Sequence, residues 1–277
     1  MSAINYEEIV PEGVATWRAR RPHRKFEVIT ATDLLFGVYE PDVLSQRVEQ
    51  MLPPGETSLD RMEAIAIVLA EPTQQVGMID AILTDEEQLA VVAERSYRFT
   101  NIHEEGQEKE SFDKLVLAAS NDGRVQVKRN IWRPEQKGRI MNTKHDHGSK
   151  DITLLDVGGN FSDDIFEEND NGEPVIAYSS QYNRQCVGEE KDIPVKEVRL
   201  KRTAQRVHTP GSINRMSEIL IHSPTMQPDV LTSTLVLTVK GAQSALVYKR
   251  EGESSPVGNV PVDVISDLQR LRSVIRK

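Results

Sequence analysis

The chain has 277 residues and a net charge of −9, from 34 basic and 43 acidic side chains, and 38% of its residues are hydrophobic. That share is too high for a disordered chain, and the acidic balance argues against a protein that coats duplex DNA. No run of about 18 apolar residues could form a membrane-spanning helix, and the acidic Met1–Pro11 segment lacks the apolar core of a secretory signal.

The first part of the chain favours helices. Residues Pro41–Leu52 carry apolar side chains at helical spacing, and a Pro-Pro-Gly sequence ends the pattern. A second helix is expected over Leu59–Ala70, with Thr57 as its N-cap. It is apolar on most sides, so we expect it to be buried. A buried strand over Ala64–Ala70 is the alternative.

A third helix has the clearest start. Thr84 and Glu87 have the spacing of a capping box, in which the threonine caps the helix and the glutamate bonds back to its amide. The predicted helix covers Asp85–Tyr97. Its apolar positions indicate one buried face.

The middle of the chain favours antiparallel strands. Residues Lys114–Ser120 and Arg124–Ile131 flank a turn that ends in Gly123, which tolerates a positive φ. A second hairpin is predicted from Ser233–Lys240 and Gln243–Arg250, because Leu235, Leu237 and Val239 in the first segment alternate with Thr234, Val236 and Thr238. Further isolated strands are expected at Ile152–Val157, Pro174–Ser179 and Ile193–Leu200.

A terminal amphipathic helix is predicted after Pro261. Its apolar stripe consists of Val264, Leu268, Leu271 and Ile275. The stripe can dock on its own domain or, because it follows a flexible linker, on a neighbouring chain.

The predicted fold is therefore α+β. A helix-rich region covers residues 1–105, and a β-rich region with antiparallel hairpins and the terminal helix covers residues 106–277. The boundary is placed in the acidic stretch Asn101–Ser111, and the two regions can also form one continuous domain.

Three long polar stretches show neither a helical nor a strand period. They are Arg133–Lys150, Gly158–Glu173 and Gln181–Asp192. Such segments bury little apolar area to offset the entropy of ordering them. We expect a neighbouring subunit or a bound polymer to order them.

Charge is segregated along the chain. One segment, Asn160–Glu173, is acidic; its candidate assembly residues are Asp163, Asp164, Glu167, Glu168, Asp170 and Glu173. Three segments are basic, and two contain tryptophan, an arrangement that suits single-stranded nucleic acid. The candidate nucleic-acid or partner residues are Trp17, Arg18, Arg20, Arg21, Arg24, Lys25, Lys128, Arg129, Trp132, Arg133, Arg199, Lys201, Arg202 and Arg206.

The most metal-like residues are His145 and His147. On a strand, residues two apart point to the same face, so both imidazoles could bind one ion. A third donor would have to fold back from Asp151, Asp156, His208 or His222. Because the sequence does not fix that donor, we expect two solvated histidines and no bound metal or other cofactor.

Two other sites are rejected. Asp163–Gly172 has the look of a calcium loop, but Tyr178 stands where an EF-hand needs a bidentate glutamate. Cys186, the single cysteine, excludes a disulfide framework. As a nucleophile it would need a nearby base such as His208, which spacing alone does not place.

The functional prediction is a non-enzymatic structural subunit of a self-assembling complex, such as a phage or other virion shell or tail, in which the acidic segment of one chain faces a basic segment of the next. We expect a homo-oligomer or multi-subunit assembly with no membrane partner, located in the cytoplasm or in the assembled particle. The alternative is an intracellular single-stranded RNA-binding protein. A third interpretation is a metal-dependent enzyme using His145 and His147.

Overall fold

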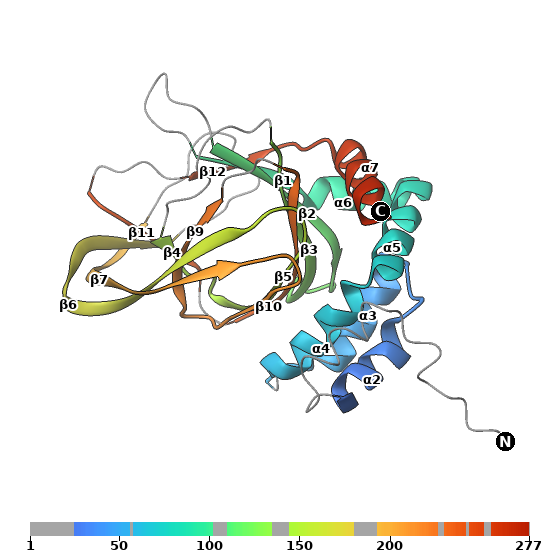
Figure 1. The fold of residues 1–277 in the computed structure, drawn as a ribbon, viewed down its shortest axis with the longest axis horizontal. Helices are drawn as coiled ribbons and strands as arrows, with labels where there is room; N and C mark the ends of the chain where they lie inside the picture. Colours follow the sequence, from blue (N-terminus) through green and yellow to red (C-terminus); the bar gives the residue numbers. More distant parts are fainter. Residues whose placement is uncertain are drawn as a thin grey trace.

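The computed structural model describes residues 25–55, 58–101, 110–134, 144–179, 193–226, 230–241, 244–251 and 256–276. Helices come first and strands follow, so the chain is a mixed α+β protein, as predicted (Figure 1). The helices are α2 (Lys25–Leu35), α3 (Pro41–Met51), α4 (Leu59–Leu69), α5 (Pro72–Thr84), α6 (Glu86–Arg95) and, at the end, α7 (Val264–Ile275).

Local capping explains where the helices begin. The hydroxyl of Ser58 accepts the amide of Asp60 at the start of α4, and the segment is the predicted helix, not the alternative strand over Ala64–Ala70. The carboxylate of Asp85 accepts the amides of Glu87 and Gln88 at the start of α6.

Helix α4 therefore begins at Leu59 as predicted but is capped one residue later, and α6 begins at Glu86, one residue later than predicted. Thr84 is the last residue of α5, and its hydroxyl donates back to the carbonyl of Asp80 instead of capping α6. Thr57, the predicted cap of α4, lies outside the described residues.

The strands form two antiparallel sheets. Their bounds are β1 (Tyr97–Asn101), β2 (Glu110–Ala119), β3 (Val125–Trp132), β4 (Lys144–His145), β5 (Ser149–Val157), β6 (Phe161–Ser179), β7 (Ile193–His208), β8 (Ile213–Met216), β9 (Ile221–Met226), β10 (Thr232–Lys240), β11 (Leu246–Lys249) and β12 (Pro256–Val260). The seven-stranded sheet has the order β12-β1-β2-β3-β10-β5-β8, and the five-stranded sheet has the order β11-β4-β9-β6-β7.

One predicted hairpin is confirmed and the other is wrong. β2 pairs with β3, and Gly123 in their turn has φ of 67°. β10 instead lies between β3 and β5, while β11 joins the second sheet beside β4 and β6. The physical reason is that β10 is buried on both faces, which suits the centre of a covered sheet.

The polar stretch Gly158–Glu173 was also misread. It forms most of β6, a long strand that pairs with β7 along its length. Phe161, Asp163 and Ile165 alternate inward, so a buried aspartate breaks the apolar pattern that would identify a strand. Gln181–Asp192 lies outside the described residues, and only the ends of Arg133–Lys150 are described.

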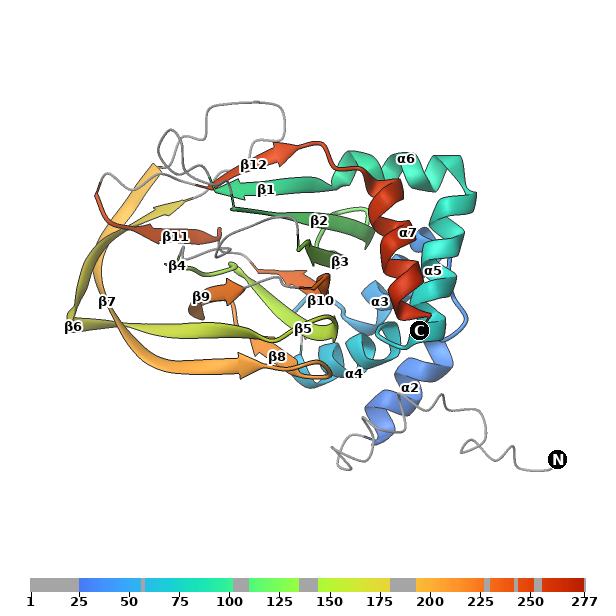
Figure 2. The same cartoon turned by 45° about the horizontal axis from the view of Figure 1, so that its top comes forward.

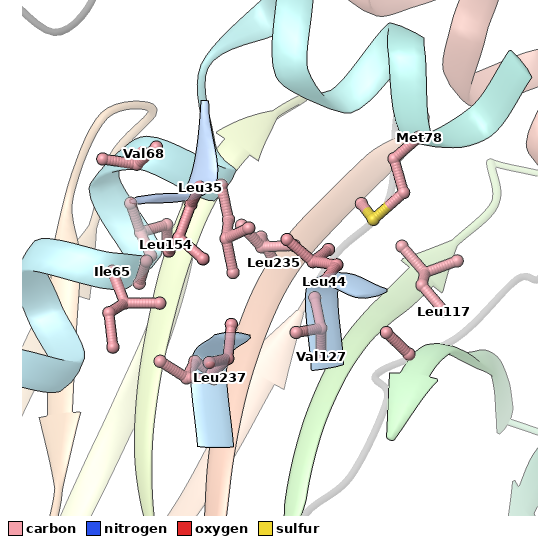
Figure 3. Packing of buried hydrophobic residues seen from close by; sticks show 14 of the residues in the cluster. Leu35, Leu44, Ile65, Val68, Met78, Leu117, Val127, Leu154, Leu235 and Leu237 are labelled. Atoms are coloured by element: carbon pink, nitrogen blue, oxygen red, sulfur yellow. The ribbon is translucent and has the colours of Figure 1, made fainter. Parts of the chain in front are cut away.

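The helices cover one face of the seven-stranded sheet, and in both views they lie to one side of the strands (Figures 1 and 2). Leu154, Leu235 and Leu237 on that face pack against helical residues such as Ile65 and Leu44 (Figure 3). Burial of this apolar area is the main stabilising contribution to the fold.

Helix α7 belongs to the same core. Val264, Leu268 and Leu271 are buried in it, and α7 packs beside α5 (Figure 2). The stripe therefore docks on its own chain. The predicted domain boundary between residues 105 and 106 lies outside the described residues and stays a prediction.

Candidate metal centre

A pocket of about 500 Å³ lies against the other face of the seven-stranded sheet. Residues of both sheets line it, including Lys128 and Thr234 from the first sheet and His222 and Met226 from the second. A pocket of this size suits a small molecule.

Three histidines converge in this pocket. His145 on β4 is the cross-strand partner of His222 on β9, and His147 follows two residues after His145. One ring nitrogen from each lies within 4.8 Å of the others. The ring centroids of His145 and His222 are 4.5 Å apart, and those of His147 and His222 are 4.9 Å apart.

Buried carboxylates orient two of the rings. Nδ1 of His222 lies 2.8 Å from the Asp163 carboxylate, and Nδ1 of His147 bonds to Asp151. Both aspartates are almost completely buried. A carboxylate on the far nitrogen of each imidazole is the usual support of a metal-ligating histidine.

This arrangement leaves two Nε2 atoms facing each other. The Nε2 atoms of His147 and His222 are 2.8 Å apart. When each Nδ1–H donates to its aspartate, both Nε2 atoms present lone pairs, and lone pairs at this distance repel. A cation between them, either a proton or a metal ion, removes that repulsion.

Burial disfavours the proton. It lowers the pKa of His147, even though the Asp151 carboxylate acts in the opposite direction. Burial would also raise the pKa of Asp151, but the charges of His147 and Lys128 more than offset this and hold the pKa well below its usual value. The carboxylate therefore stays ionised and available to hold His147.

Asp146, between the first two histidines, fixes the segment that carries them. Its carboxylate accepts the Tyr248 hydroxyl at 2.8 Å and the Leu246 amide at 2.9 Å, and burial raises its pKa. Asp146 is thus already bonded to the neighbouring strand. Three imidazole donors would leave further coordination positions of an ion to water or substrate, which is typical of catalytic sites.

The structure supplies the third donor that the sequence did not fix. His222 lies 75 residues from His147 in the chain, and no local signal joins them. Asp151 and His222 were two of the four residues that the sequence offered as a third metal donor. Asp163 was instead assigned to an acidic assembly surface. In the structure Asp163 instead supports His222 from inside the fold.

The remaining acidic candidates meet basic residues of the same chain. Asp164 on β6 pairs with Arg202 on β7 at 3.3 Å, and Glu168 pairs with Lys196 on β7. Glu173 pairs with Lys144 at 3.1 Å and also contacts Arg250, and these contacts lower its pKa. Glu167 and Asp170 are exposed on β6. The segregated charges therefore need no neighbouring subunit to pair them.

The basic and aromatic candidates of the second segment lie largely inside the fold. Trp132 is stacked on Phe112 with ring centroids 5.4 Å apart, so it is no surface platform for a base. Arg129 is buried and pairs with Asp156 at 2.6 Å. Arg133 pairs with two buried carboxylates, Asp113 and Asp267, and burial raises the pKa of Asp267 to about 6.

The other basic candidates are dispersed. Arg199 donates to the Gly172 carbonyl, Arg206 donates to Asn214, and Lys201 is exposed on β7. Lys25 begins α2. Trp17, Arg18, Arg20, Arg21 and Arg24 lie outside the described residues, as does Cys186.

His208 is also buried, but it stands outside the donor group. Its ring stacks on Phe161, and its Nε2 is 3.9 Å from the Asp163 carboxylate. Burial lowers its pKa.

No protein-family model matches the chain, and no curated protein matches it. Among solved structures, it is similar to a cupin superfamily protein from Desulfitobacterium hafniense, with 11% identity over 50% of this chain and 84% of that one, at a TM-score of 0.26. It is also similar to a cupin-like protein from Thermotoga maritima, with 10% identity over 61% and 87% of the two chains and a TM-score of 0.28.

Oxalate decarboxylase from Bacillus subtilis is a third such structure, with 9% identity over 53% of this chain and 30% of that one, and a TM-score of 0.29. At these values the likenesses assign neither a family nor an activity to the chain.

The expectation of a non-enzymatic virion, phage shell or tail subunit was wrong. A three-histidine group that lines a pocket is the arrangement of a metal site and not of a subunit that serves only to build a lattice. Within the described ranges, no helix is long and apolar enough to span a bilayer. The expectation of oligomeric partners stays a prediction.

Proposed function

We propose that this protein binds a divalent transition metal through His145, His147 and His222 and uses it as an enzyme acting on a small molecule. The observation that carries the proposal is the pair of facing Nε2 atoms, each belonging to a ring held by a buried aspartate. Without a cation the lone pairs of the two Nε2 atoms repel each other. With a metal ion between them, the two rings are ligands whose far nitrogens are held by the Asp151 and Asp163 carboxylates.

The donor set limits the metal. Three imidazoles suit zinc, iron, nickel, copper or cobalt better than calcium or magnesium, which prefer oxygen ligands. A metal held there would polarise a substrate oxygen or lower the pKa of a bound water.

The protein's own residues would fix the geometry. Asp151 and Asp163 set the ring orientations of His147 and His222, and Asp146 holds the segment that carries the first two histidines. The pocket gives a small substrate direct access to the histidine group, because all three rings line its wall.

Metal titration tests this proposal. Purified protein, stripped with a chelator and titrated with Zn²⁺ by calorimetry, is expected to bind one ion per chain. His222→Ala should weaken binding by at least about 100-fold, and Asp163→Asn by about 10–100-fold, the usual effect of removing a supporting carboxylate.

His208→Gln is the matched control, because this buried histidine lies near Asp163 but outside the donor group. It should retain wild-type affinity for Zn²⁺. Failure of the wild-type protein to bind Zn²⁺, Mn²⁺, Fe²⁺ or Ni²⁺ at one ion per chain would overturn the proposal, as would wild-type affinity in the His222→Ala variant.

A further inference from the structure

One lysine of the pocket, Lys128, has no carboxylate within ion-pair distance among the described residues. Lys128 projects from the centre of β3 into the pocket wall, and its side chain is only partly exposed. Within the described ranges it forms neither an ion pair nor a hydrogen bond. Burial of this ammonium outweighs the attraction of the Asp151 carboxylate, and an anion bound at Lys128 would offset that cost.

The acidic groups of the pocket are already engaged. Asp151 holds His147, Asp163 holds His222, and Asp146 accepts the Tyr248 hydroxyl. Two further lysines, Lys114 and Lys240, line the same pocket and add positive charge near Lys128. Burial lowers the pKa of Lys128 to about 8; the Asp151 charge acts in the opposite direction, and the two lysines add to the lowering. Lys128 thus has one opposing charge near it, Asp151, which already holds His147.

Neutral polar atoms beside Lys128 also lack partners. They are the amide oxygen of Asn130 and the hydroxyls of Thr153 and Thr234, all buried and without a hydrogen bond in the described structure. The strand register places them together, because Thr234 is opposite Asn130, and Val236 lies between Lys128 and Thr153. Buried hydroxyls of this kind can donate to an oxygen of a bound ligand.

The same face becomes aromatic farther along β3. Trp132 lies two pleats from Lys128, about 13 Å along the strand, and stacks on Phe112. Phe161 and Met226 complete an apolar cluster with them. The pocket therefore has a charged end, where Lys128 lies near the histidine group, and an apolar end.

We propose that the pocket binds a small organic acid, with its carboxylate on Lys128 and its apolar part against Trp132 and Phe112. The proposal rests on the proposed function in one respect, because it makes this acid the substrate presented to the metal. A carboxylate is favoured over a phosphate because no arginine is among the described residues that line the pocket, whereas phosphate sites favour several donors in fork geometry.

Binding of hydrocinnamate, a small acid with an apolar body, tests the proposal. Calorimetry would compare hydrocinnamate, its neutral amide and inorganic phosphate, each with metal-free and Zn²⁺-loaded protein. Hydrocinnamate should bind at least about 10-fold tighter than the amide, since a charge-assisted bond distinguishes them. Phosphate should neither bind nor compete.

Variants locate the site. Lys128→Met should abolish the preference for the acid over the amide while the protein still binds one Zn²⁺ per chain, and Lys128→Gln should do the same with a polar side chain of similar reach. Lys201→Met, at an exposed lysine of β7, is the control and should bind hydrocinnamate as the wild type does.

The outcomes separate the two proposals. Zn²⁺ binding without hydrocinnamate binding, or with a preference for the acid that survives both Lys128 substitutions, would overturn this inference and leave the metal site intact. Hydrocinnamate binding that depends on Lys128 without any metal binding would support the anion site and overturn the proposed metal function. Competition by phosphate would overturn the assignment to carboxylates.

Discussion

Two neighbouring cations on β3, Lys128 and Arg129, point to opposite faces of the same sheet and have opposite surroundings. Arg129 lies under the helices, where its guanidinium makes two bonds to the Asp156 carboxylate, at 2.6 and 2.7 Å. Gln75 of α5 donates to the same carboxylate at 2.8 Å. Lys128, in the pocket, has no such partner.

The difference shows how the two faces are used. On the helix-covered face, a buried charge is neutralised within the fold and ties α5 to the sheet. On the pocket face, Lys128 has no carboxylate within ion-pair distance among the described residues, and the hydroxyls of Thr153 and Thr234 have no hydrogen-bond partner. Polar groups that a fold leaves unpaired in a pocket are a physical indication of a ligand.

The largest effect is expected from Arg129→Met. Removing the guanidinium leaves the Asp156 carboxylate without its main partner in a largely buried position, which costs about 3–5 kcal/mol of the free energy of unfolding. Urea denaturation would measure it. A loss below about 1 kcal/mol would contradict the view that this face neutralises its own charges.

A matched pair on β10 sharpens the comparison. Leu235→Ala removes a fully buried side chain from the helix-covered face and should cost about 2–5 kcal/mol. Thr234→Val, one residue earlier and facing the pocket, removes an unpartnered hydroxyl and should change stability by less than about 1 kcal/mol. Equal losses in thermal or urea denaturation would show that the two faces do not differ in this way.

Lys128→Met is expected to act in the opposite direction to Arg129→Met. Because burial of the Lys128 ammonium outweighs its attraction to Asp151, replacing it by an apolar side chain should raise the free energy of unfolding of the ligand-free protein by about 1–3 kcal/mol at neutral pH. A destabilised variant in the same urea experiment would mean that Lys128 has a stabilising partner.

The pH dependence gives a smaller and independent effect. The pKa of Lys128 is about 8 in the folded chain and 10.5 for an ordinary lysine, so between these values the unfolded chain holds a proton that the folded chain has released. Stability contributed by this group therefore rises with pH across that window. Lys128→Met should remove that rise, which denaturation at a series of pH values would detect.

Much of the fold follows from local patterns in the sequence. The helices over Pro41–Met51 and Leu59–Leu69, the β2–β3 turn at Gly123 and the terminal helix all depend on neighbouring residues, and all were predicted close to their observed bounds. Caps were wrong by one residue because adjacent polar side chains compete for the same amides.

The site could not be predicted in the same way. His222 reaches His145 only through the pairing of β4 with β9, which no local pattern specifies. The second part of β6 was predicted as the strand Pro174–Ser179, but its first part was missed because Asp163 points inward to support His222, and a buried carboxylate resembles a loop residue in the sequence. The residues that obscured the strand pattern are those that build the candidate site.

X-ray absorption at the edge of the bound metal tests the central claim most directly. For Zn²⁺-loaded wild-type protein, we predict imidazole scattering from three histidines at about 2.0–2.1 Å, with the remaining positions filled by oxygen ligands. His222→Ala should show fewer imidazoles or no bound metal. A spectrum of the wild-type protein with oxygen ligands alone, or with a single imidazole, would contradict a metal centre built from His145, His147 and His222.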